Sequence, residues 1–132
     1  PAPLARALRA KPGPGTVVLV TDAKSPTGTD LTSFELNGRP IPRADGALRL
    51  ADVTLAGADL DMIDAVNFMI DRIGLDENEV LRMAALYPAE AMGISATHGH
   101  LQPGAVANFV HLTAERDVSS TWIAGEKVWS AA

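Results

Sequence analysis

The sequence predicts an α/β protein, and two observations lead to this prediction. A helical segment over 4–11, with Leu4 and Leu8 on one face, ends at a Pro- and Gly-rich turn. This turn leads into residues 16–21, which are rich in β-branched side chains. The apolar centre of this run shows no alternation, which is typical of a parallel strand buried on both faces by helices. From residue 105 onward, short strand patterns replace the helical ones and predict a small all-β part.

The composition excludes several classes of protein and partner. The 132 residues suit a single domain, and a hydrophobic content of 47 % excludes extensive disorder. The net charge of −5 and the absence of basic runs argue against nucleic acid or an anionic membrane as a partner. The sequence has no cysteine, which excludes disulfides and thiolate metal sites. No apolar run approaches the roughly 20 residues that span a bilayer, and no signal peptide is visible, so we expect a cytoplasmic protein.

Residues 34–50 predict an inserted β-hairpin. Asn37-Gly38 is a strong signal for a two-residue turn between strands. Pro40 and Pro42 predict that the strand after this turn is an edge strand or irregular, because proline has no N–H to donate. The expected short strands are 34–36, 39–41 and 47–50.

Two helices are expected after the hairpin. Apolar residues recur with the helical period over 59–73, and Gly74 is placed to end that helix. A second helix is expected over about 77–86. The candidate N-caps are Asp59 or Asp61 for the first helix and Asp76 for the second. Further strands are expected over 106–112, 121–123 and 126–129.

Asp22 is the first candidate for chemistry, because it directly follows the predicted buried strand. Barrels of the α/β class place catalytic groups at the C-terminal ends of their strands. A carboxylate there can act as a general base on a water molecule. Aspartate at this place can equally cap the loop that follows. Position alone leaves both interpretations open.

The segment Leu55, Ala56 and Gly57 is the second candidate, because small residues precede a predicted helix there. Small residues let a ligand approach the backbone N–H groups at a helix N-terminus. A tight connection between a strand and a helix explains the same residues, and residue types alone favour that simpler interpretation.

The histidines have the spacing of a metal-binding pair but no complete ligand set. His98 and His100 flank a glycine, while His111 lies on another predicted strand. A catalytic zinc site takes three protein ligands, and the sequence offers no third ligand nearby. We therefore expect His98 and His100 to lie in a surface loop, and we expect no metal ligand in this chain.

Several motifs resemble, in the same order along the chain, those of the N-acetylglucosamine-6-phosphate deacetylases in the amidohydrolase superfamily. Residues 19–23, LVTDA, resemble the eighth-strand motif of this family, and residues 54–57, TLAG, resemble its GTLAGS segment. Two positions depart from the pattern, since Val53 and Ala58 stand where the family usually has Gly and Ser. Further similar segments are 81–84, 87–89, 101–104, 107–108 and 123–125.

The resemblance covers the last third of the family's length and implies a fold. It implies the end of a (β/α)8 barrel over 1–104, with the hairpin insertion at about 34–50. Residues 105–132 would add strands of a small β-sandwich domain. The family's metal ligands and most of its sugar-phosphate contacts would lie upstream of Pro1. We therefore expect a piece of a longer enzyme that is inactive in isolation, with the rest of its own barrel and further copies of the protein as partners.

The resemblance also implies a mechanism. In such enzymes a divalent metal, zinc or similar, activates a water molecule and polarises the acetamide of N-acetylglucosamine 6-phosphate. Asp22 would take the proton of this water and return it to the leaving amine. The backbone of Leu55, Ala56 and Gly57 would lie beside the sugar phosphate. The products would be acetate and glucosamine 6-phosphate, in amino-sugar metabolism.

Two other interpretations remain open. The chain can be the C-terminal part of another amidohydrolase, related to D-aminoacylases or dihydroorotases, because these share the late aspartate and the small β domain. It can also be a free-standing module without catalytic activity. The residues encoded before Pro1 would discriminate among the three interpretations.

Overall fold

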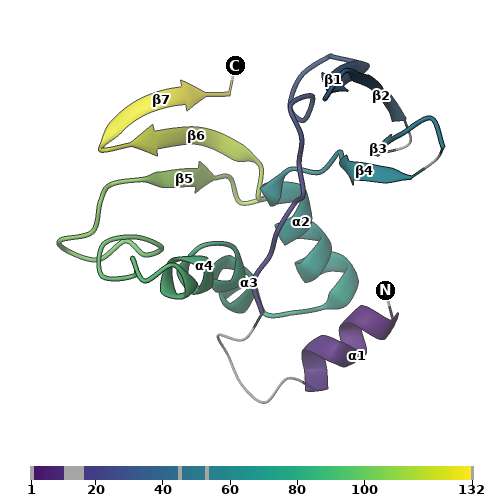
Figure 1. Cartoon of the computed structure of the whole chain (residues 1–132). Coiled ribbons are helices and arrows are strands. Elements are labelled where there is room, and N and C mark those ends of the chain that lie inside the picture. Colours follow the sequence, from purple (N-terminus) through teal and green to yellow (C-terminus); the bar gives the residue numbers. More distant parts are fainter. Residues whose placement is uncertain (1, 11–16, 45, 53, 132) are drawn as a thin grey trace. The chain divides into compact units, whose positions relative to one another are not determined.

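The computed structural model describes residues 2–10, 17–44, 46–52 and 54–131 and shows a mixed α/β fold (Figure 1). These residues divide into two compact units, which we call the first unit (1–19 and 66–132) and the second unit (20–65). The elements in chain order are α1 (Ala2–Ala10), β1 (Ser33–Leu36), β2 (Arg39–Ala44), β3 (Ala47–Arg49), β4 (Leu55–Ala58), α2 (Met62–Phe68), the π-helical turn η1 (Met69–Ile73), α3 (Glu77–Ala84), α4 (Leu86–Ala91), β5 (Phe109–Leu112), β6 (Val118–Ile123) and β7 (Glu126–Ser130). The predicted division of the chain between residues 104 and 105 stays a prediction.

The predicted buried strand over 16–21 is wrong for the residues that the structure describes. Residues 17–22 form no ladder with any other described segment. Val20 is 74 % exposed, whereas a strand covered on both faces would bury it. The apolar run therefore lacks the neighbouring strands that would turn it into part of a parallel sheet. The first backbone pairing after it is a single parallel bridge between Ala23 and Ala58.

The second unit is built on an antiparallel sheet in the order β1-β2-β3-β4. The predicted turn at Asn37-Gly38 is confirmed, with φ values of 52° and 74° at these two residues. In an antiparallel hairpin, residue pairs joined by backbone hydrogen bonds alternate with pairs that are not. Pro40 and Pro42 belong to pairs of the second kind, so both proline nitrogens face away from β1. On that side β3 pairs only with Arg43 and Ala44. The sheet thus accommodates both prolines without losing a hydrogen bond.

Helix α2 follows β4 and confirms the predicted helix, with one addition. The Asp61 carboxylate accepts a hydrogen bond from the Asp64 N–H at 2.9 Å, so Asp61 rather than Asp59 caps the helix. The helix continues into η1, and Gly74 ends it with a left-handed φ of 77°. The sequence carries no signal for the change from α-helical to π-helical hydrogen bonding.

Helices α3 and α4 contribute four buried apolar residues to the core of the first unit. The Asp76 carboxylate accepts from the Glu79 N–H at 3.1 Å, as expected of an N-cap. The Glu79 carboxylate accepts from the Tyr87 hydroxyl at 2.7 Å, and Arg82 donates to both groups. The hydrogen bonds that Arg82 donates to Tyr87 and Glu79 raise the pKa of Arg82, and the bond to Tyr87 has the larger effect. The buried apolar residues here include Val80, Met83, Tyr87 and Ala89.

The C-terminal sheet has the order β5-β6-β7, and its strands confirm the three that the sequence predicts (Figure 1). Phe109 and Trp122 stack across β5 and β6, with ring centroids 5.4 Å apart. The Asn108 side chain accepts from the Ala124 N–H at 2.8 Å and so ties β5 to the turn between β6 and β7. None of the helices within the described ranges has the length and apolar character needed to cross a membrane.

Met83 and Met92 provide a matched test of this packing. Met83 is 0 % exposed and Met92 is 76 % exposed. We expect Met83→Ala to lower the free energy of unfolding by about 2–5 kcal/mol, because it leaves a cavity in the helical core. We expect Met92→Ala to change it by less than about 0.5 kcal/mol. Chemical denaturation followed by tryptophan fluorescence measures both, and equal effects would contradict the placement of Met83.

Candidate active site

The structure brings together the two segments that the sequence analysis selected. Ala23, directly after Asp22, forms a parallel bridge with Ala58 at the end of β4. The Ala58 N–H donates to the backbone carbonyl of Asp22 at 3.3 Å. Both segments belong to the second unit, so this proximity is a property of one compact part of the chain.

Gly57 permits this close approach because it has no side chain. It is buried, and a Cβ atom at this position would lie 2.7 Å from the Lys24 Cγ and 3.0 Å from the Asp22 carbonyl oxygen. Contacts this short require the neighbouring atoms to move. The glycine therefore allows β4 to lie directly against the residues that follow the apolar run.

Asp22 itself lies in an uncommon backbone conformation. Its φ is 51°, in the left-handed region that few residues other than glycine adopt, although aspartate tolerates it. The Thr21 hydroxyl accepts a hydrogen bond from the Ala23 N–H at 3.2 Å. The Asp22 carboxylate is 62 % exposed and forms an ion pair with Lys24. An accessible carboxylate of this kind can accept a proton from water.

The segment Leu55–Gly57 is strand β4 rather than a loop at a helix N-terminus. Leu55 is 59 % exposed, Ala56 is half-buried and Gly57 is buried. A turn precedes the strand, in which the Thr54 N–H donates to the Asp52 carboxylate at 3.0 Å. That bond lowers the pKa of the Asp52 carboxyl below its usual value.

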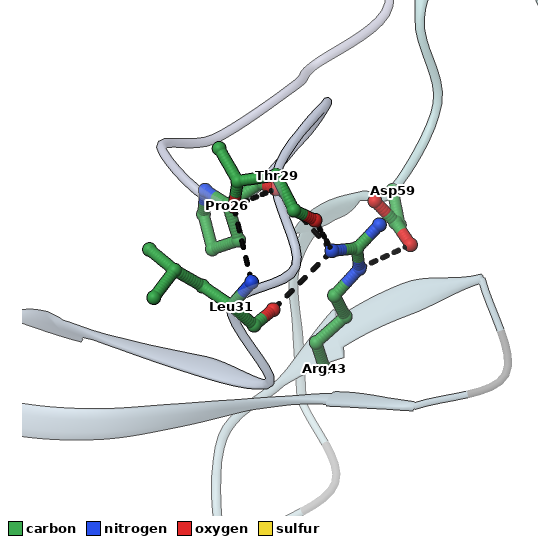
Figure 2. Close-up of polar contacts among 5 residues, drawn as sticks. All are labelled: Pro26, Thr29, Leu31, Arg43 and Asp59. Carbon is green, nitrogen blue, oxygen red and sulfur yellow. Dashed lines mark hydrogen bonds and ion pairs between the residues drawn. The ribbon is translucent and has the colours of Figure 1, made fainter.

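Arg43 is a residue of this region that the sequence analysis missed. Its Nε donates to the Asp59 carboxylate at 2.6 Å. Its Nη1 donates to three backbone carbonyls in the loop after Asp22, those of Pro26, Thr29 and Leu31 (Figure 2). Nothing in the sequence near Arg43 indicates these partners, because most of them are carbonyl groups, which every residue has.

The three histidines are in the first unit and make local hydrogen bonds. His98 bonds the Thr97 hydroxyl at 2.9 Å, and His100 bonds the Ser95 carbonyl at 2.8 Å, both within the loop after α4. His111 lies on β5 and bonds the Ser119 hydroxyl at 2.9 Å. Among the residues that the structure describes, no three His, Asp or Glu side chains gather in a way that could hold a metal ion. The described residues thus do not fit a divalent metal centre by themselves.

The contact at Gly57 yields a prediction about stability. We expect Gly57→Ala to lower the free energy of unfolding by about 1–3 kcal/mol, because the new methyl group overpacks against Lys24 and Asp22. In a Lys24→Ala background the two short carbon contacts are gone, so the same substitution should cost at least about 0.5 kcal/mol less. Denaturant titration of the four proteins measures this difference, and equal costs in both backgrounds would show that the contact is not tight.

Comparison with known proteins places this site in context. The chain matches the Amidohydrolase family over residues 8–128. It is 34 % identical to the N-acetylgalactosamine-6-phosphate deacetylase of Escherichia coli O157:H7 over 110 residues, which cover 83 % of this chain and 29 % of that protein. It is 35 % identical to the human N-acetylglucosamine-6-phosphate deacetylase over 133 residues, which cover 99 % of this chain and 32 % of that protein.

Solved structures give the same result. The crystal structure of N-acetylglucosamine-6-phosphate deacetylase from Pasteurella multocida matches with a TM-score of 0.87 and 30 % identity, over 96 % of this chain and 33 % of that one. The chain thus spans about a third of the length of these relatives. Since the family match covers most of the chain and includes Asp22 and all of β4, the chain belongs to the amidohydrolase family.

Proposed function

We propose that this chain is the C-terminal third of an N-acetylhexosamine-6-phosphate deacetylase, in which Asp22 transfers protons and Leu55, Ala56 and Gly57 line the substrate. One observation carries the proposal. The backbone of Asp22 lies against Gly57 and Ala58, so the two segments with resemblance-based roles are neighbours in one unit. The deacetylase relatives support the reaction class, at 34–35 % identity.

The proposed reaction is hydrolysis of an acetamide. As the oxygen of a water molecule bonds to the acetamide carbon, the Asp22 carboxylate takes one proton of that water. As the bond between carbon and nitrogen breaks, the protonated Asp22 gives the proton to the leaving amine nitrogen. The products are acetic acid and the free amino-sugar phosphate, and Asp22 returns to its ionised form; the acid then ionises to acetate and the amine takes up a proton. One carboxylate thus acts first as base and then as acid.

A divalent metal, zinc or similar, is expected of the complete enzyme. When bound, it would polarise the amide carbonyl and activate the attacking water. The described residues of this chain offer no ligand set for it. We propose that its ligands come from the part of the barrel that the relatives have in addition to the matched third. On this proposal the 132 residues alone are inactive.

The fold of the complete enzyme is part of the same proposal. Residues 1–104 would be the end of a (β/α)8 barrel with a hairpin insertion at 34–50, and residues 105–132 would be strands of a small β-sandwich domain. The exposed apolar side chains of Val18 and Val20 support this arrangement, since the rest of the barrel would cover them. We also propose that the complete enzyme is a homo-oligomer in the cytoplasm.

For the substrate we propose a class of sugar, the N-acetylhexosamine 6-phosphates. The relatives include deacetylases of both N-acetylglucosamine 6-phosphate and N-acetylgalactosamine 6-phosphate, at nearly equal identity. The two substrates differ in the configuration of one hydroxyl group. Measurement of kcat/KM for both sugars with the full-length protein decides between them. N-acetylglucosamine 6-phosphate is our first expectation.

Asp22→Asn in the full-length protein tests the proposed proton transfer. The amide keeps the size of the carboxylate but cannot accept and return a proton. We expect kcat for acetate release to fall about 10²–10⁴-fold, with metal content and fold unchanged. His98→Ala and His100→Ala are the controls, and each should change the rate by less than about threefold, as for surface substitutions.

Two outcomes would contradict this assignment. If Asp22→Asn stays within tenfold of the parent, Asp22 is not the proton-transfer group. If His98→Ala or His100→Ala loses both metal and activity, the histidine pair belongs to the metal site. Metal analysis of each purified variant, together with steady-state kinetics, separates the two.

A further inference from the structure

We infer that Arg43 is a positioning residue for Asp22, through a clamp that joins the loop after Asp22 to the residue after β4. This inference rests on the proposed function, because it assigns a task to Asp22. It adds a residue that carries no resemblance motif and that lies far from both site segments in the sequence.

The clamp consists of one guanidinium group and four acceptors (Figure 2). On the loop side, Nη1 donates to the carbonyls of Pro26 at 3.3 Å, Thr29 at 2.5 Å and Leu31 at 3.2 Å. On the strand side, Nε donates to the Asp59 carboxylate at 2.6 Å. Asp59 directly follows β4, and its N–H donates to the Gly46 carbonyl at 3.2 Å. The guanidinium therefore connects loop 24–31 to one end of the strand pair β3-β4, where β3 begins and β4 ends.

The chemistry of the clamp requires arginine. A guanidinium is planar and donates in several fixed directions, so one group can bond a carboxylate and a set of carbonyls at once. The side chain of Arg43 is 26 % exposed and that of Asp59 is 17 % exposed, so the pair is largely shielded from water. A lysine ammonium at the same place keeps the charge but cannot reach all four acceptors with this geometry.

The clamp acts on Asp22 through the short connection between them. Loop 24–31 begins two residues after Asp22, whose own φ of 51° is an unfavourable conformation. Such a conformation persists only where the surroundings hold it on several sides. The bond from Ala58 to the Asp22 carbonyl holds it on one side, and the loop held by Arg43 holds it on the other. Loss of the clamp should let Asp22 move from its productive position.

Arg43→Lys and Arg39→Lys form a matched pair for the test. Both residues lie on β2, and Arg39 is exposed at the turn end of the hairpin. In the full-length protein we expect Arg43→Lys to lower kcat about tenfold or more, because small displacements of a catalytic group are costly. KM should change by less than about threefold, since Arg43 does not reach the substrate segment directly. Arg39→Lys should leave both values unchanged.

A double-mutant cycle separates positioning from general stabilisation. If Arg43 acts through Asp22, Arg43→Lys should lower the residual rate by less than twofold in an Asp22→Asn background. A role of Arg43 in catalysis that does not act through Asp22 would lower the rate by the same factor in both backgrounds. All rates are measured well below the melting temperature of each variant, so that the folded fraction is complete.

Amide hydrogen exchange tests the clamp without any assay of activity. The Thr27 and Thr29 amides bond to carbonyls within the loop, at 2.9 Å and 3.0 Å. We expect their exchange to become at least about fivefold faster in Arg43→Lys and to stay unchanged in Arg39→Lys.

The outcomes distinguish this inference from the proposed function. If Asp22→Asn loses activity but Arg43→Lys matches Arg39→Lys, the inference is wrong and the proposed function stands. If Asp22→Asn keeps its activity, the proposed function is wrong, and so is the positioning role of Arg43. Unchanged exchange at Thr27 and Thr29 in Arg43→Lys overturns the clamp, whatever the activity.

Discussion

The close approach of two backbones at Asp22 and Gly57 is the constraint on which the candidate site depends. One segment directly follows an apolar run, and the other is the last strand of an antiparallel sheet. They meet through backbone atoms, with the Ala58 N–H on the Asp22 carbonyl and no side chain at residue 57 in between. The position of the carboxylate then follows from main-chain geometry, which is more rigid than a contact between long side chains.

This backbone contact does not depend on the side chain at residue 58, one of the two positions that depart from the family pattern. Ala58 stands where the family usually has serine, but its contribution here is an N–H group that every residue other than proline has. The pairing of Ala58 with Ala23 likewise requires no particular side chain. A change of side chain at residue 58 therefore preserves the link to Asp22.

The sequence predicted those features that depend on neighbours close in the chain. The turn at Asn37-Gly38 and the caps at Asp61 and Asp76 each need only three or four consecutive residues, and all are confirmed. The run over 16–21 was misjudged because the state of a buried strand depends on strands that lie far away in the sequence. Arg43 was missed for the same reason, since its partners lie 12 to 17 residues distant and most are carbonyls.

The orientation of Pro40 and Pro42 has a consequence for how this protein behaves among other copies of itself. On the side of β2 that faces away from β1, residues 39–42 have no ladder partner within the described part of the chain. Exposed strand edges of this kind commonly recruit strands from other molecules and start aggregation. Here the two nitrogen atoms that face this side, those of Pro40 and Pro42, carry no hydrogen, so an added strand would find no N–H donor on residues 39–42. The two prolines thus protect the hairpin against aggregation while the opposite edge of β2 keeps its pairing with β1.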